Sequence, residues 1–343
     1  MPERTIIGKP PSLPERPLKV VAMGGGHGLS SLLHGLKRYA HPGEVHPMLE
    51  ITAIVTVTDD GGSSGRLRRE FDVLPPGDIR NCMVALSEDE ALLSKLFQYR
   101  FTSGRGLKGH SFGNLFLTAM THLTKDFAQA VVLSSEVLRS AGRIYPSTRS
   151  NVTIEAELEN GRVVRGETKI SRSRVPIKEL RLLPARAQPL PETLAAIAQA
   201  DLITFGPGSL FTSVIPNVLV DGIPEAIQKS SALKAYFVNL MWQPYETMNF
   251  SAYDHVQAIE RHAGRQLLDV VVVNTHPISG AMRRRYASDQ VFPVENDLHR
   301  MVDQGIEVLG RSLLARGEKV RHDPELSASV VLELAQRGRR QFD

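Results

Sequence analysis

The segment that most constrains the fold is an apolar run followed by a glycine-rich turn and an amphipathic helix. Residues 18–23 (LKVVAM) form a short, partly β-branched apolar run, which predicts a buried strand. Glycines follow directly, and leucines then recur at helical spacing from Leu29 to Leu36. A second apolar run, LEITAIVTV, occupies 49–57. The order strand, helix, strand predicts a parallel sheet with right-handed crossovers, which is an α/β fold.

The second half of the chain repeats this order of elements. An apolar tetrapeptide at 202–205 predicts a strand, and a second glycine-rich loop follows it at 206–217. Between the two halves, the segment at about 150–172 alternates apolar and polar side chains around Asn160-Gly161, which predicts a β-hairpin. The pattern therefore indicates one doubly wound domain with a mostly parallel sheet and a small hairpin insert.

We place the boundaries of this domain at residues 18 and 322. The Pro-rich, charged segment 1–17 is expected to be a flexible lead-in, and 323–343 a C-terminal helix and tail. Helical periodicity further predicts helices at 84–101, 111–123, 126–140 and 324–336, with Gly142 as a C-cap.

Composition narrows the class of protein. The single cysteine, Cys82, excludes an internal disulfide framework and a cysteine-based zinc site. No apolar run approaches the ~18 residues of a membrane span, and no signal-peptide core is present, so we expect a cytoplasmic protein that does not bind membranes. The formal net charge is only +4, the clusters of basic residues lie far apart in the sequence and aromatic residues make up 6%, which disfavours a nucleic-acid partner.

Gly24, Gly25, Gly26 and Gly28, with His27 among them, occupy the place where α/β proteins hold phosphates. Free N–H groups at the N-terminus of the following helix point into such a loop, and the helix dipole favours an anion. The segment is neither the G-x-G-x-x-G fingerprint nor a P-loop, because leucine stands at the third glycine position and a Gly-Lys-Ser/Thr ending is missing. A tight turn without a ligand is the alternative interpretation.

The second loop, FGPGSLFTSVIPN, offers the same chemistry. Gly206 and Gly208 provide backbone freedom, and Ser209, Thr212 and Ser213 add hydroxyl groups. Since both loops follow parallel strands, we expect them at the same carboxyl edge of the sheet, where open α/β sheets bind ligands. Asn217 either caps the next turn or contacts a base or sugar.

A polar stretch, TVTDDGGSSGRLR, ends the second strand. Asp59 and Asp60 are candidates to bind a ribose hydroxyl, to hold Mg²⁺ against phosphates or to act as a general base. Ser63 and Ser64 add hydroxyl groups to the same segment. The alternative is a turn in which an aspartate bonds the glycine backbone.

Two further segments supply candidate ligand groups. Asp78, Arg80 and Asn81 follow Pro-Pro-Gly and suggest a second wall of the same pocket, although Asp78 is equally suited to cap the next helix. His110 and Asn114 lie in GHSFGN, where His110 is a candidate catalytic base, a phosphate partner or a hydrogen-bonded structural histidine. No motif typical of a protein-only metal cage is present, so any metal is expected to be Mg²⁺ shared with phosphates.

The chain resembles the YvcK, or gluconeogenesis factor, family over about residues 18–322, in blocks that read GGGHGL, TVTDDGGSSGRLR, PPGDIRN, FQYRF, LKGHSFGNL, FGPGSLFTSVIPN and ETMNFSAYDHV. That family is related to CofD, the 2-phospho-L-lactate transferase of deazaflavin cofactor synthesis. The resemblance implies a cytoplasmic protein with a Rossmann-like, three-layer α/β/α fold. It also implies that the protein binds UDP-sugars, notably UDP-N-acetylglucosamine, with no established turnover and no required cofactor. It also implies a role in cell shape and peptidoglycan synthesis during gluconeogenic growth, with a cell-wall enzyme as a partner.

The resemblance also assigns site residues. The first glycine loop matches the nucleotide contacts, and Asp59-Asp60 matches the acidic site that the transferases place near metal and acceptor. Asn217 and Arg321, the latter in KVRHD, match residues linked to the UDP-sugar. The segment NLMWQPYETMNFSAYDHV departs from the family, with Trp242 and other large side chains in place of small or acidic ones. This departure predicts an altered sugar or base preference if the segment reaches the ligand.

Two other functions are weighed against this one. The alternative is a CofD-like, Mg²⁺-dependent transferase that moves a phospholactyl-type group from a nucleotide-activated donor, with the aspartates holding the metal. An NAD(P) enzyme is disfavoured, because the glycine spacing is wrong and Asp59 lies 31 residues beyond Gly28 (59 − 28) where such enzymes place an acidic residue after about 20. From the frequencies of oligomeric states we expect a homodimer.

Overall fold

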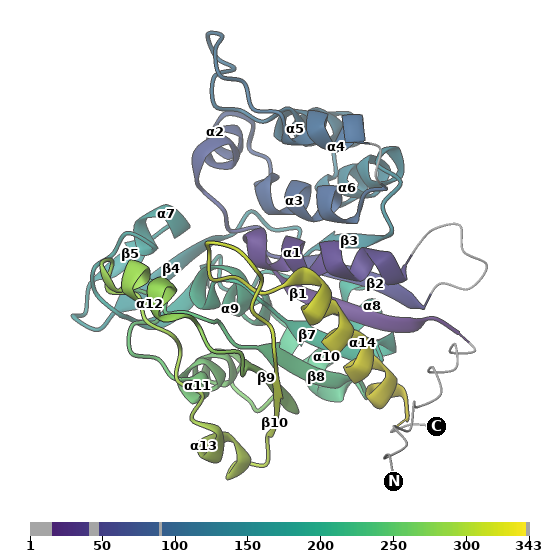
Figure 1. Cartoon of the computed structure of the whole chain (residues 1–343). Helices are drawn as coiled ribbons and strands as arrows, with labels where there is room; N and C mark the ends of the chain where they lie inside the picture. The colour runs from purple at the N-terminus through teal and green to yellow at the C-terminus, as the bar shows by residue number, and fades with distance from the viewer. Residues whose placement is uncertain (1–15, 41–47, 89–90, 341–343) are drawn as a thin grey trace.

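The computed structural model describes residues 16–40, 48–88 and 91–340. The predicted lead-in at 1–17, apart from its last two residues, and the end of the predicted tail lie outside these ranges. Within them, the main element is a seven-stranded parallel sheet of order β10-β9-β8-β7-β1-β2-β3 (Figure 1). Its strands are β1 (Leu18–Gly24), β2 (Leu49–Val55), β3 (Gly142–Pro146), β7 (Leu202–Phe205), β8 (Leu233–Phe237), β9 (Val270–Asn274) and β10 (Glu307–Arg311).

Helices cover both faces of this sheet, because its strands are nearly continuous apolar runs that need cover on both sides. On one face, α1 (Gly26–Leu36) packs against α14 (Pro324–Arg340), which also contacts β1, β7 and β8 (Figure 1). On the other face, α8 (Pro191–Gln199) packs against α10 (Ile223–Lys229). The predicted three-layer α/β/α fold is therefore confirmed, and the predicted helix at 324–336 continues to residue 340.

The chain between β2 and β3 forms a helical lobe beyond one end of the sheet, at the top of Figure 1. The predicted helices at 111–123 and 126–140 correspond to two of its helices, with ends shifted by up to three residues. The lobe contains α2 (Gly62–Phe71), α3 (Gly77–Leu86), α4 (Ala91–Gln98), α5 (Phe112–Thr124) and α6 (Phe127–Val137).

The predicted continuous helix at 84–101 is wrong. Helix α3 ends before Ser87, because this residue takes extended backbone and pairs with Ser140 beside β3. Helix α4 is a separate element. Gly142 is not a C-cap either, since it opens β3 at a point where a Cβ would lie 2.9 Å from the carbonyl oxygen of Ile51.

The insert that follows β3 is a small antiparallel sheet of order β5-β4-β6. The predicted hairpin is confirmed as β4 and β5, and Gly161 in its turn has a φ of 78°. The prediction missed β6 because the polar, proline-containing segment RSRVP interrupts the alternation, and it missed a helical turn after β5. The elements are β4 (Thr153–Leu158), β5 (Val163–Arg165), α7 (Glu167–Ile170) and β6 (Ile177–Leu183).

Candidate functional site

The order of the strands reverses between β1 and β7. From β1 the chain proceeds outward to β2 and β3, whereas from β7 it proceeds in the opposite direction to β8, β9 and β10. Open α/β sheets bind ligands in the crevice at the carboxyl ends of the strands at such a switch point. The two glycine loops, residues 24–28 and 206–213, leave β1 and β7 at this crevice.

The two glycine loops touch each other. A Cβ at position 28 would lie 2.2 Å from the carbonyl oxygen of Pro207, so this approach requires Gly28. The buried Asn217 side chain donates from Nδ2 to the carbonyl oxygens of Gly24, at 3.3 Å, and Ser213, at 2.8 Å. Its Oδ1 has no hydrogen-bond partner among the residues that the structure describes. Asn217 therefore fastens the first loop to the second from behind.

A polar cavity of about 480 Å³ lies between the glycine loops and the first turns of α2 and α3. Most of the ligand residues predicted from the sequence line it: Gly25, Gly26, His27, Gly28, Asp59, Ser63, Ser64, Asp78, Arg80, Asn81, Asn114, Gly208, Ser209 and Thr212. The predicted ligand residues outside its lining are Gly24, Gly206, Asn217 and Arg321, and the catalytic or metal candidates Asp60 and His110 also lie outside it.

Helices α1, α2 and α3 all begin at the wall of this cavity. Their first residues, Gly26, Gly62 and Gly77, line it, and no side chain of the capping residue bonds any of the three first turns. The N–H groups of a helix's first turn have no partner within the helix, and together with the positive end of the helix dipole they make such termini suitable for anions. The cavity is therefore chemically suited to a group with several anionic oxygens, such as a diphosphate.

Carboxylic acids line the same cavity. Asp78 does not cap α3 but reaches across to accept a hydrogen bond from the Gly26 N–H, and burial, together with the charge of Asp59, raises its pKa to about 7. Glu167 enters from α7 of the insert, where burial and then the charges of Asp59 and Asp78 raise its pKa to about 9. Near neutral pH, Glu167 therefore keeps its proton and can donate as well as accept hydrogen bonds.

A hydrogen-bond network supports the cavity from the side of the helical lobe. Arg80 donates to Ser111 Oγ at 2.5 Å and to Asn114 Oδ1 at 3.1 Å. Asn114 donates to Ser63 Oγ at 3.1 Å, and the same hydroxyl lies 2.9 Å from His110 Nδ1. His110 is buried behind Ser63, and burial, followed by the charge of Arg66, lowers its pKa. His110 thus positions Ser63 and does not line the cavity.

The two adjacent aspartates have different surroundings. Asp60 Oδ1 accepts hydrogen bonds from the backbone N–H and the hydroxyl of Thr168, at 2.9 and 2.6 Å, which ties β2 to the insert. Asp59 Oδ1 accepts from the Gly61 N–H at 2.8 Å, and its Oδ2 faces Gly77. In the described ranges, no three His, Cys, Asp or Glu side chains form a ready-made metal cage. A Mg²⁺ ion held by Asp59 would therefore need phosphate oxygens to complete its shell.

A second cavity, of about 430 Å³, adjoins the first and shares His27, Gly28 and Gly208 with it. Arg321 lines this second cavity, and no hydrogen bond or ion pair engages its guanidinium within the described part of the chain. Trp242 also lines it, so the segment that departs from the family pattern does reach the crevice.

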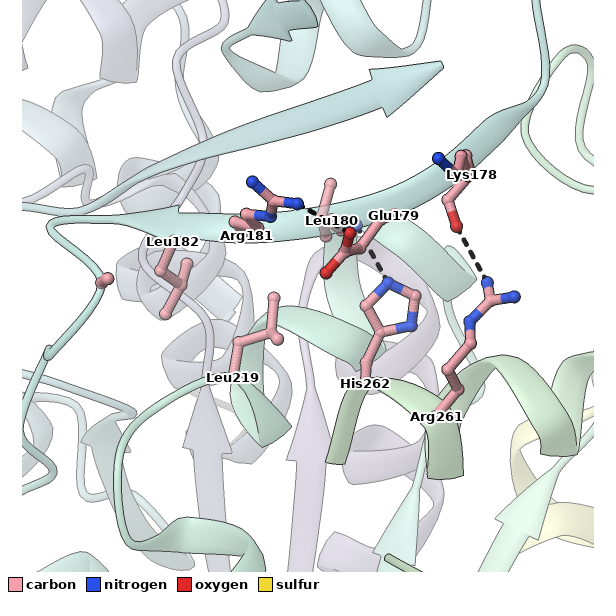
Figure 2. A pocket seen from close by; sticks show the side chains of 9 residues that line it. Lys178, Glu179, Leu180, Arg181, Leu182, Leu219, Arg261 and His262 are labelled. Atoms are coloured by element: carbon pink, nitrogen blue, oxygen red, sulfur yellow. Dashed lines mark hydrogen bonds and ion pairs between the residues drawn. The ribbon is translucent and has the colours of Figure 1, made fainter. Parts of the chain in front are cut away.

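Another cavity of similar size lies between β6 and α11 (Ala252–Ala263), as Figure 2 shows, and it shares no lining residue with the first two. Its main polar groups are already engaged with the edge of β6. His262 Nε2 accepts a hydrogen bond from the Leu180 N–H at 2.9 Å, and Arg261 donates to the Lys178 carbonyl at 3.0 Å (Figure 2). These bonds fasten the insert to the main domain, and we place the functional site at the switch point.

Sequence reasoning missed several residues that line the first cavity. Glu167 lies 108 residues after Asp59 (167 − 59), and no local pattern links the two. Arg100 lies in the block FQYRF, and this block was the only signal that pointed to it. Ser213 was not missed, because the sequence offers it beside Ser209 and Thr212 as a hydroxyl of the second glycine loop, and it lines this cavity.

Comparisons with known proteins show which family the chain is similar to. A family model described as 2-phospho-L-lactate transferase CofD matches residues 20–314. The gluconeogenesis factor of Bacillus subtilis is 45% identical over 317 residues, covering 92% of this chain and 98% of that protein. A putative gluconeogenesis factor of Thermotoga maritima is 45% identical over 322 residues, covering 92% and 98%. A crystal structure of a UPF0052 family member from Bacillus halodurans superposes with a TM-score of 0.87 at 44% identity, covering 92% and 99%.

Length and hydrophobicity decide whether a helix can span a membrane. No single helix in the described ranges is both long and apolar enough to cross a bilayer. The bent pair Leu210–Val218 and Ile223–Lys229, with 74° between its halves, meets the length and composition requirement jointly.

Proposed function

The chain belongs to the gluconeogenesis factor family of CofD-like proteins, and on this basis we propose that it is a cytoplasmic regulatory protein that binds a nucleotide sugar of the UDP-N-acetylglucosamine type. The observation that carries the proposal is the convergence of two glycine loops and the N-termini of α1, α2 and α3 on one polar cavity. Such a convergence favours a ligand with two or more phosphoryl groups.

The carboxylic acids of the cavity favour a sugar beside the phosphates. Asp59, Asp78 and Glu167 line the same cavity as the helix N-termini. Three ionised carboxylates would repel a diphosphate, but the raised pKa values of Asp78 and Glu167 reduce this repulsion near neutral pH. Carboxyl groups that donate and accept hydrogen bonds match the hydroxyl groups of a hexose.

The proposal extends to the cellular role. We propose that occupancy by the nucleotide sugar reports the supply of wall precursors, and that the bound form, as a homodimer, acts on a cell-wall enzyme during gluconeogenic growth. A strain without this protein is expected to lose normal cell shape on a gluconeogenic carbon source. The Arg80→Ala variant, expressed in that strain, is expected not to restore the shape. If it restores the shape as fully as the wild-type protein does, a role that depends on the ligand is contradicted.

One observation favours a second function. The matching family model is described as a transferase, and Asp59 keeps a carboxylate oxygen at the phosphate cavity. Asp59 would hold Mg²⁺, and the metal would neutralise phosphate charge in a CofD-like transfer of a phospholactyl-type group. This alternative requires turnover, whereas the regulatory proposal requires binding alone.

Phosphorus NMR tests whether the nucleotide sugar binds without turnover. With UDP-N-acetylglucosamine, Mg²⁺ and substoichiometric protein, we expect both phosphorus signals to broaden or shift and no new signal to grow. Arg80→Ala, which removes a guanidinium from the cavity wall, is expected to abolish the broadening. Arg143→Ala, at the exposed amino end of β3, is the matched control and is expected to behave as wild type. Growth of two phosphate monoester signals, those of UMP and N-acetylglucosamine 1-phosphate, would mean that water cleaves the diphosphate, and would overturn the proposal of binding without turnover.

A further inference from the structure

We propose that the second cavity binds the uracil ring of the nucleotide sugar, with Trp242 as its stacking surface and the residue that selects the base. This inference rests on the proposed function and goes beyond it by fixing the direction in which the ligand lies. The diphosphate lies at the glycine wall that both cavities share, and the sugar lies in the first cavity.

The shared wall makes this direction possible. His27, Gly28 and Gly208 line both cavities, and α1 begins at Gly26 directly beside them. A diphosphate held at this wall has one substituent pointing into each cavity. With about 480 and 430 Å³, each cavity has room for one ring system of a nucleotide sugar.

The two cavities differ in chemistry, and this difference assigns the two ends of the ligand. The first cavity offers Asp59, Asp78 and Glu167, which suit sugar hydroxyls. The second offers the apolar side chains of Met241 and Trp242, which suit a flat ring. The reverse arrangement would leave hydroxyl groups against the indole and place the base among carboxyl groups.

The indole of Trp242 is held in place before any ligand arrives. Its Nε1–H donates to the Phe250 carbonyl at 3.1 Å, and its backbone N–H donates to the Phe292 carbonyl at 2.8 Å. The Phe292 ring packs edge-to-face against the indole, with 5.4 Å between centroids. A stacking surface fixed in this way loses little conformational entropy on binding.

The segment that carries Trp242 is also joined to the second glycine loop. Gln243 Nε2 donates to Ser209 Oγ at 2.5 Å, and Gln243 Oε1 accepts from the Leu210 N–H at 3.0 Å. The position of the indole is therefore tied to the loop that faces the phosphates.

Two polar groups beside Trp242 match the edge of uracil. The unengaged guanidinium of Arg321 can donate to a ring carbonyl. His322 hydrogen-bonds Val238 through one ring nitrogen, and within the described residues its Nε2 has no partner. Burial lowers the pKa of His322 to about 4, so this Nε2 is an acceptor at neutral pH. A donor beside an acceptor complements the carbonyl and N3–H of uracil, whereas cytosine carries no hydrogen at N3.

The chain itself provides the reporter for a test, because Trp242 is its only tryptophan. The ligand-free, full-length protein is titrated with UMP, CMP and N-acetylglucosamine 1-phosphate while tryptophan fluorescence is recorded. We expect UMP to quench the fluorescence, CMP to bind at least several-fold more weakly, and the sugar phosphate to bind without quenching. Quenching by the sugar phosphate and none by UMP would reverse the proposed direction and overturn the inference.

Variants test the same assignment by calorimetry. Trp242→Ala is expected to lower the affinity for UMP on the order of tenfold to a hundredfold, as the loss of one aromatic stacking partner does. The affinity for the sugar phosphate is expected to stay unchanged. Trp242→Phe keeps a ring and is expected to retain UMP affinity within a few-fold, which also excludes misfolding as the cause. Glu167→Gln is the reciprocal variant. It is expected to lower the affinity for the sugar phosphate and to leave the affinity for UMP unchanged.

The outcomes separate this inference from the proposed function. If UDP-N-acetylglucosamine binds the wild type and Trp242→Ala equally well, the base lies elsewhere and only this inference fails. If neither the nucleotide sugar nor its fragments bind the wild type, the proposed function fails as well.

Discussion

Replacing Glu167 with glutamine is expected to stabilise the ligand-free protein as the pH rises. The pKa of this carboxyl group is about 9 in the folded protein, against 4.5 as its ordinary value, because the group is largely withdrawn from water and faces the charges of Asp59 and Asp78. Below pH 4.5 both folded and unfolded chains hold the proton, so the group has no effect. Between about pH 4.5 and 9 the unfolded chain releases the proton and the folded protein retains it, so stability falls as the pH rises. Above about pH 9 the loss is complete.

The size of the effect follows from the same two values. At about 1.4 kcal/mol for each pKa unit, the difference between 4.5 and about 9 sets a ceiling of about 6 kcal/mol. Glu167 is partly exposed at the cavity wall, so solvent screening reduces this ceiling to about 2 kcal/mol. For a domain of this size, the entropy of unfolding converts about 2 kcal/mol into a shift of roughly 3 °C in Tm.

Scanning calorimetry at pH 5, 7 and 9 measures this effect. Glu167→Gln should match the wild type near pH 5 and exceed its Tm by roughly 3 °C at pH 9. Glu159→Gln, at the exposed turn of the β4–β5 hairpin, is the matched control and should follow the wild type at every pH. A Tm difference for Glu167→Gln that stays constant from pH 5 to pH 9 would refute the reasoning, because it would mean that Glu167 ionises normally in the folded protein.

Three further predictions concern the glycine loops and the second cavity. Asn217→Ala should lower the free energy of unfolding by about 1–3 kcal/mol in urea titrations as well as weaken nucleotide-sugar binding, since it removes the side-chain hydrogen bonds that join the two loops; unchanged stability would contradict this role of Asn217. Arg321→Ala should lower the affinity for UDP-N-acetylglucosamine about tenfold, measured by calorimetry, with no change in Tm. Unchanged affinity would show that Arg321 does not contact the ligand. Gly28→Ala should cost at least about 1–3 kcal/mol, because its Cβ would meet the Pro207 carbonyl; wild-type stability would show that the loops separate freely.

Much of the architecture could be predicted from local pattern. The apolar runs that became β1, β2 and β7, and the leucines of α1, carry their periodicity in neighbouring residues. The failures occurred where distant contacts decide the outcome. Ser87 leaves the helix because Ser140 pairs with it, and Gly142 joins the sheet because the backbone of β2 lies against it. Strand β6 needed β4 as a partner, and the polar segment between them concealed the pairing.

The candidate site likewise contains residues that local pattern could predict and residues that depend on distant contacts. Loop glycines and the hydroxyls of Ser63 and Ser64 follow buried strands, so their place at the carboxyl edge could be predicted from strand order. The sequence could not decide whether Asp60 faces the cavity, because its partner Thr168 belongs to the insert. For the same reason Glu167 was missed, since only the folded insert brings it to Asp59.

Isothermal titration calorimetry with UDP-N-acetylglucosamine, with and without Mg²⁺ and beside UDP-glucose, GDP and NAD, tests the central claim most directly. The account predicts saturable micromolar binding of the UDP-sugar, with GDP and NAD much weaker. Selective, Mg²⁺-dependent binding of GDP without any response to the UDP-sugar would contradict it and would favour the transferase.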